Sequence, residues 1–114
     1  MVNSGFDPSF LDTLGRMMLT SDSFRYMTRI LAKVADELCQ GRLLLTHEGG
    51  YSEIYVPFCG LAVMEELTHT NTGIQDPFIQ DVGSPHWVKL QPHQKDIVDR
   101  AADNLKIALI PENK

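Results

Sequence analysis

The stretch from residue 22 to residue 67 constrains the fold most, because it places a short apolar strand between two helical patterns. Residues 22–40 repeat apolar side chains at helical spacing, and Gly41 suits the position just past a helix end. Residues 42–47 predict a strand, and their continuous apolar run is typical of burial on both faces of a parallel sheet. A second helix is expected over residues 53–67. This order predicts one helix-rich α/β domain. The apolar face expected on the first helix consists of Phe24, Met27, Ile30, Leu31, Val34 and Leu38.

The loop after this strand, Glu48-Gly49-Gly50-Tyr51, places a phenol where the strand ends. The two glycines free the backbone from the steric limits that other residues impose. Ligands of open α/β sheets bind outside the carboxyl ends of the strands, so Tyr51 is a candidate for chemistry. A glycine pair before an aromatic residue also fits an ordinary turn, and these residues alone leave both interpretations open.

Further motifs accompany this loop in one register, from about residue 3 to residue 68 and more loosely through residues 76–78. Together they resemble the class II histone deacetylases, especially the bacterial histone-deacetylase-like and acetylpolyamine amidohydrolases. The matching motifs are Gly5-Phe6-Asp7, Asp12-x-Leu14-Gly15-Arg16-Met17, Leu19-Thr20, Glu48-Gly49-Gly50-Tyr51, Tyr55, Pro57-Phe58-Cys59-Gly60-Leu61-Ala62 and Glu65-Glu66-Leu67-Thr68.

The resemblance implies the C-terminal part of an arginase/deacetylase-like fold, a parallel sheet with flanking helices. It also implies zinc-dependent hydrolysis of acetyl-lysine or acetylpolyamine amides. Asp7 falls on the family's last zinc-binding aspartate, and residues 1–6 on the strand that leads to it. Tyr51 falls on the tyrosine that stabilises the oxyanion, and Gly49 and Gly50 fall on glycines that shape the substrate pocket. A carboxylate is a good zinc ligand, and a phenol can donate a hydrogen bond without becoming charged.

Two positions near Asp7 depart from the family pattern. Pro8 stands where a small residue such as alanine is usual, and Thr13 stands in place of a turn proline. Pro8 pushes Asp7 toward extended backbone geometry, which changes the expected aim of the carboxylate. The missing turn proline is expected to cost little stability.

The family's other catalytic residues do not occur in this sequence. The resemblance implies two more zinc ligands, an aspartate and a histidine two residues apart, and an adjacent histidine pair as general base. No Asp-x-His occurs, and the four histidines, at positions 47, 69, 86 and 93, are not adjacent. Catalytic zinc needs three protein ligands, so we expect that this chain alone retains no zinc and is inactive. Residues 1–114 are therefore interpreted as the C-terminal third of a deacetylase domain.

Three functional interpretations remain open. The chain is part of a zinc deacetylase that a longer polypeptide or a complementing chain completes. Alternatively, it is a non-catalytic remnant that forms homo-oligomers or binds other proteins through an open sheet edge. A third interpretation is a fragment of low stability without a function of its own.

Charge and cysteine content limit the partners and the location. The net charge of −5 and the absence of a basic cluster argue against direct binding of nucleic acid and mildly favour cationic substrates. Cys39 and Cys59 are interpreted as buried, reduced thiols. The sequence shows no signal peptide and no membrane span, so a cytoplasmic protein is expected.

Residues 69–91 are expected to be irregular, with Trp87 anchoring this segment through its large apolar area. A final helix is predicted over residues 92–109, because Pro92 suits a first helical turn and Pro111 a stop. Its expected buried stripe consists of Ile97, Val98, Ala101, Leu105 and either Ile107 or Ala108.

Overall fold

The computed structural model describes residues 1–15, 17–82 and 90–108. The chain forms two compact units, residues 1–82 and residues 83–114. Among the described residues, the first unit holds two short strands and three helices, and the second holds one helix.

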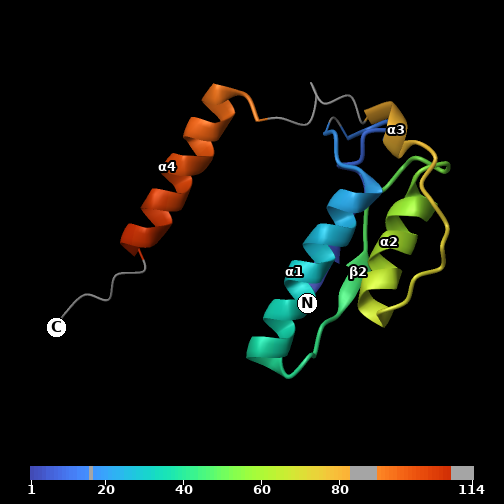
Figure 1. Cartoon of the computed structure of the whole chain (residues 1–114), viewed down its shortest axis with the longest axis horizontal. Coiled ribbons are helices and arrows are strands. Elements are labelled where there is room, and N and C mark those ends of the chain that lie inside the picture. Colours follow the sequence, from blue (N-terminus) through green and yellow to red (C-terminus); the bar gives the residue numbers. More distant parts are fainter. Residues whose placement is uncertain (16, 83–89, 109–114) are drawn as a thin grey trace. The chain divides into compact units, whose positions relative to one another are not determined.

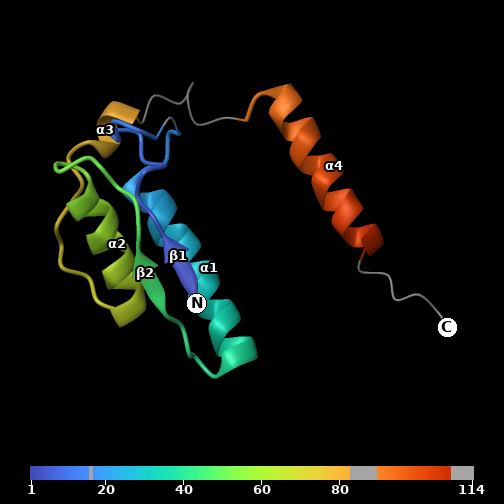
Figure 2. The same ribbon diagram turned by 180° about the vertical axis from the view of Figure 1, so that it is seen from behind.

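The two strands form a parallel sheet (Figures 1 and 2). β1 (Val2–Ser4) lies beside β2 (Leu45–His47), with Val2 opposite Leu45. The observed strand β2 begins later than the expected strand of residues 42–47. The parallel pairing and the helices confirm the predicted α/β class and its helix-rich character.

α1 (Ser21–Cys39) begins one residue before the start and ends one residue before the end of the helix expected over residues 22–40. The Thr20 N–H donates to the Ser23 hydroxyl at 3.2 Å, which satisfies a backbone donor that the helix start leaves unpaired. Gln40 and Gly41 both have left-handed φ values, 57° and 74°, and they end the helix.

α2 (Val56–Thr68) begins later than the expected residue 53. A turn precedes it, in which the Tyr55 N–H donates to the Ser52 carbonyl at 3.1 Å. Pro57 lies in the first helical turn, where its missing N–H costs nothing. α2 packs against α1 (Figure 1).

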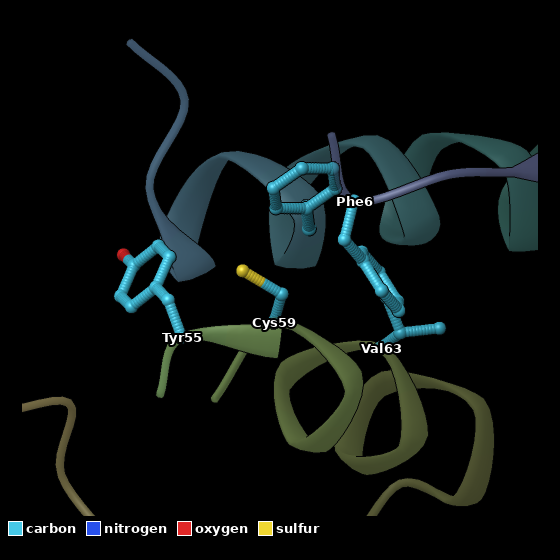
Figure 3. Packing of buried hydrophobic residues seen from close by; sticks show 5 residues of the cluster. Phe6, Tyr55, Cys59 and Val63 are labelled. Carbon is cyan, nitrogen blue, oxygen red and sulfur yellow. The ribbon is translucent and has the colours of Figure 1, made fainter. Parts of the chain in front are cut away.

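The core lies where these two helices meet the end of β1. Phe6, just after β1, and Phe24 on α1 stack edge to face with ring centroids 5.2 Å apart. Figure 3 shows the core side chains in the space between α1 and α2. The buried cluster consists of Phe6, Phe24, Tyr55, Cys59 and Val63.

The apolar face predicted for α1 is largely exposed. Phe24 is buried, but the side chains of the other members from Met27 onward are half-buried or exposed, with Leu38 77% exposed. The helix is about 28 Å long, whereas a three-residue strand is about 10 Å long, so the sheet covers only part of the face. The prediction of a buried Cys39 is also wrong, because Cys39 is the last residue of α1 and lies on the exposed part of this helix. Cys59 is buried, as predicted.

The remaining described residues add two helices. α3 (Ile79–Val82) corrects the expectation that residues 69–91 are wholly irregular. The expected anchor Trp87 lies outside the described residues. α4 (Pro92–Ala108) confirms the final predicted helix.

Within the second unit, taken by itself, the apolar stripe expected on α4 is exposed. Ile97, Val98 and Leu105 are each more than half exposed. The helix instead carries ion pairs along its surface, such as Lys95 with Asp99 at 2.6 Å. None of the helices in the described part of the chain is both long and apolar enough to cross a membrane.

Candidate functional site

The carboxyl ends of β1 and β2 bring the two candidate segments together. The Glu48 N–H donates to the Ser4 carbonyl at 3.3 Å, and the Phe6 N–H donates to the Gly49 carbonyl at 2.6 Å. These bonds continue the parallel pairing past both strands. Asp7 therefore lies beside the Gly49 loop at the edge of the sheet where ligands of α/β folds bind.

Glycines surround Asp7 and leave no room for side chains. A Cβ atom added to Gly5 would lie 2.5 Å from Asp7 Oδ1, and one added to Gly49 would lie 2.7 Å from the same atom. A Cβ on Gly15 would lie 1.6 Å from the Asp7 carbonyl oxygen. The half-buried Asp7 carboxylate thus lies against backbone on these sides.

The chain accommodates Pro8 beside this aspartate. The Pro8 carbonyl accepts the Leu19 N–H at 3.1 Å, and Ser9 forms a β-bridge with Leu19. Pro8 thus takes part in pairing through its carbonyl, where its missing N–H is not needed.

Gly50 holds a backbone conformation that side chains disfavour. Its φ is 141°, and an added Cβ would lie 2.9 Å from Val56 Cγ2 and 3.1 Å from Phe6 Cβ. Only glycine fits this position without displacing the core. The sequence expectation that the two glycines free the backbone from ordinary steric limits agrees with this geometry at Gly50.

Tyr51 follows these glycines, and its side chain is 55% exposed. Its backbone N–H donates to Asp12 Oδ2 at 2.7 Å. The same carboxylate accepts the N–H groups of Leu14 and Gly15 at 2.8 Å and 2.7 Å through Oδ1. Asp12 therefore connects the loop after β1 to the loop after β2.

These hydrogen bonds lower the pKa of Asp12, the largest contribution coming from the Gly15 N–H and the next from the Tyr51 N–H. In the sequence, Asp12 belongs to one of the matching motifs, but the resemblance implied no role for it. An aspartate shortly before a glycine is typical of a turn in which the carboxylate binds following N–H groups, and this signal could have identified it.

A second polar cluster, which no sequence pattern indicated, lies at the start of α2. The buried Tyr55 hydroxyl accepts the Ser21 N–H at 2.9 Å and donates to Asp76 Oδ2 at 2.8 Å. The Ser21 hydroxyl donates to the same oxygen at 2.6 Å. Burial raises the pKa of Tyr55, and the hydrogen bond to Asp76 raises it further. This cluster joins the N-terminal ends of α1 and α2 to the segment before α3.

The described residues do not form a complete zinc site. No group of three histidine, cysteine, aspartate or glutamate side chains that could hold a metal ion occurs among them. His47 and His69 are exposed, His93 lies on α4, and His86 lies outside the described residues. A catalytic zinc site needs three protein ligands, and this site offers the Asp7 carboxylate.

Comparisons with known proteins connect this geometry to one family. A family model described as histone deacetylase domain matches residues 1–67. The chain is 54% identical over 77 residues to a histone deacetylase-like amidohydrolase of Pseudomonas aeruginosa, covering 68% of this chain and 20% of that protein. It is 36% identical over 77 residues to histone deacetylase 8 of Arabidopsis thaliana, covering 68% of this chain and 19% of that protein.

A more distant relative is a probable deacetylase of Archaeoglobus fulgidus, 31% identical over 67 residues, which cover 58% of this chain and 19% of that protein. The chain thus spans about a fifth of the length of each of these three relatives.

Proposed function

The chain belongs to the histone deacetylase family, and we propose that it forms one wall of a zinc-dependent deacetylase active site. The observation that carries this proposal is the position of Asp7. Its carboxylate lies against Gly5 and Gly49, at the strand ends from which the Tyr51 loop also starts. A carboxylate bordered by glycine backbone is accessible to a ligand that side chains would otherwise exclude.

Each residue of the wall has a separate role in this proposal. Asp7 is one of three protein ligands of the zinc ion. The bound zinc would polarise the amide carbonyl and lower the pKa of a water molecule. The Tyr51 hydroxyl donates a hydrogen bond to the carbonyl oxygen as negative charge develops on it. Gly49 and Gly50 let the backbone approach the substrate closely.

The proposed substrates are acetyl-lysine or acetylpolyamine amides, and the proposed activity requires the rest of a deacetylase domain. The sequence has no Asp-x-His and no adjacent histidine pair, so further ligands and a general base must come from residues outside this chain. The net charge of −5 suits cationic substrates. The 114 residues alone should therefore be inactive. A cytoplasmic location stays a prediction.

A fusion protein tests this proposal. In it, the full chain replaces the matched segment of the Pseudomonas aeruginosa relative, to which it is 54% identical. We expect the fusion to hydrolyse an acetyl-lysine peptide, and Tyr51→Phe to lower kcat by about 100-fold to 1,000-fold. Tyr26→Phe is the matched control, because Tyr26 is an exposed tyrosine on α1. A folded fusion without deacetylase activity, or one indifferent to Tyr51→Phe, would refute the proposal.

A second candidate function, a non-catalytic module that associates with itself, is favoured by one observation. The α1 side chains of Met27, Ile30, Val34 and Leu38 are all more than 40% exposed. Contiguous exposed apolar surface is typical of protein interaction sites. A concentration-dependent oligomer that persists in the Asp7→Ala/Tyr51→Phe double variant would support this alternative, and a monomer at all concentrations would exclude it.

A further inference from the structure

We infer that Asp12 is a positioning residue that holds the Tyr51 loop in its working geometry. This inference rests on the function proposed above, because it concerns how the proposed oxyanion donor is aimed. Asp12 does not touch the substrate in this account, and it acts through the backbone of Tyr51.

The contacts of Asp12 divide between its two oxygens. Oδ1 accepts the N–H groups of Leu14 and Gly15 at 2.8 Å and 2.7 Å, which fixes the carboxylate within its own turn. Oδ2 accepts the Tyr51 N–H at 2.7 Å, from a residue 39 positions later. Hydrogen bonds from N–H groups to an ionised carboxylate are roughly twice as strong as neutral ones.

The Tyr51 loop depends on such a backbone contact. Packing does not fix the ring, because the side chain is 55% exposed. The preceding Gly50 has φ 141° and lacks the steric limits that would otherwise restrict the chain. The hydrogen bond from the Tyr51 N–H to Asp12 restricts this backbone freedom at Tyr51 itself.

The same turn also abuts the proposed metal ligand. Gly15 approaches the Asp7 carbonyl so closely that an added Cβ would lie 1.6 Å from its oxygen. Asp12 therefore relates the position of the Tyr51 backbone to that of Asp7. The lowered pKa of Asp12 is consistent with a carboxylate that stays ionised in this role. The carboxylate oxygens of Asp12 face backbone N–H groups. The positive partial charge of these N–H groups disfavours the binding of a cation to this carboxylate.

A double-mutant cycle in the fusion protein tests the role. Asp12→Asn keeps the shape but cannot accept N–H groups at both positions. We expect kcat to fall by at least about tenfold while KM changes by less than about twofold, because only alignment is lost. If Asp12 acts through Tyr51, Asp12→Asn should lower kcat little further when Tyr51→Phe is already present. Glu53→Gln is the control, because it removes an exposed carboxylate two positions after Tyr51.

The contact itself is tested in the full chain by NMR. We expect the Tyr51 amide proton to be shifted downfield and slow to exchange, and to lose both properties in Asp12→Ala but not in Glu53→Gln. An unaltered amide in Asp12→Ala, or a spectrum of an unfolded chain, would overturn the inference. So would an active fusion in which Tyr51→Phe abolishes turnover and Asp12→Asn does not lower kcat. A folded fusion without activity refutes the proposed function instead, and the NMR result then still decides the contact.

Discussion

The hydroxyl of Tyr55, whose side chain is fully buried, donates a hydrogen bond of 2.8 Å to Oδ2 of Asp76. The same hydroxyl accepts the N–H of Ser21, the first residue of α1. One phenol therefore connects the starts of both long helices of the N-terminal unit to the segment that leads into α3.

Removing this hydroxyl should destabilise the fold. Tyr55→Phe keeps the ring in the core but leaves the Ser21 N–H and one Asp76 bond without a partner. An unpaired buried polar group costs about 1–3 kcal/mol, so the free energy of unfolding should fall by that amount. Urea unfolding followed by circular dichroism measures it. The control Tyr26→Phe changes a ring that is 61% exposed and should alter stability by less than about 0.5 kcal/mol. Equal effects of the two variants would contradict the role of the Tyr55 network.

Gly49→Ala should disturb the Asp7 carboxylate. The new methyl group would lie 2.7 Å from Asp7 Oδ1, so the carboxylate or the loop must move. In the fusion protein we expect turnover to fall by about 100-fold, the usual scale for a displacement of about 1 Å at an active site. Gly60→Ala is the matched control. Its Cβ would lie 3.9 Å from the Phe6 ring, and alanine in a helix interior should stabilise α2 by about 0.5–1 kcal/mol. An active Gly49→Ala fusion would show that this close approach does not matter.

Stability should fall at acid pH through Glu65. The hydroxyl and N–H of Thr72, and then the Arg25 guanidinium, lower the pKa of Glu65 from 4.5 to about 2. A carboxylate whose pKa is lower in the folded state stabilises the fold fully above the unfolded value, and this contribution is lost as pH falls toward the folded value.

Urea midpoints measured between pH 6 and pH 2.5 test this expectation. The unmodified chain should lose stability more steeply below pH 4.5 than Glu65→Gln, whose side chain does not titrate. Glu37→Gln serves as the control, because the Glu37 side chain is 61% exposed, and its profile should follow that of the unmodified chain. Parallel profiles for the unmodified chain and Glu65→Gln would contradict the assignment.

Much of the backbone could be predicted from local patterns. The spacing of apolar residues and the positions of Gly41 and Pro92 indicated α1 and α4, because helix periods and ends depend on neighbouring residues. The sequence placed Tyr51 at the carboxyl end of a strand, and the observed contact of Asp7 with the Gly49 loop agrees with the rule that the carboxyl ends of parallel strands share one edge of the sheet.

Burial and long-range polar contacts could not be predicted in the same way. An apolar face such as that of α1 is buried only where another element covers it, and the sequence pattern of one helix does not show how far that cover extends. The bonds from Asp12 to Tyr51 and from Tyr55 to Asp76 join residues 39 and 21 positions apart, so only the tertiary fold brings them together.

The measurement that tests the central claim most directly is the zinc content of the purified fusion protein. Zinc content and turnover are measured together for the parent fusion and for each variant. We predict one zinc per molecule in the parent fusion, retained zinc with lost turnover in Tyr51→Phe, and loss of both in Asp7→Ala. Full zinc content in Asp7→Ala, with turnover unchanged, would contradict the claim that this chain supplies a metal ligand to a deacetylase active site.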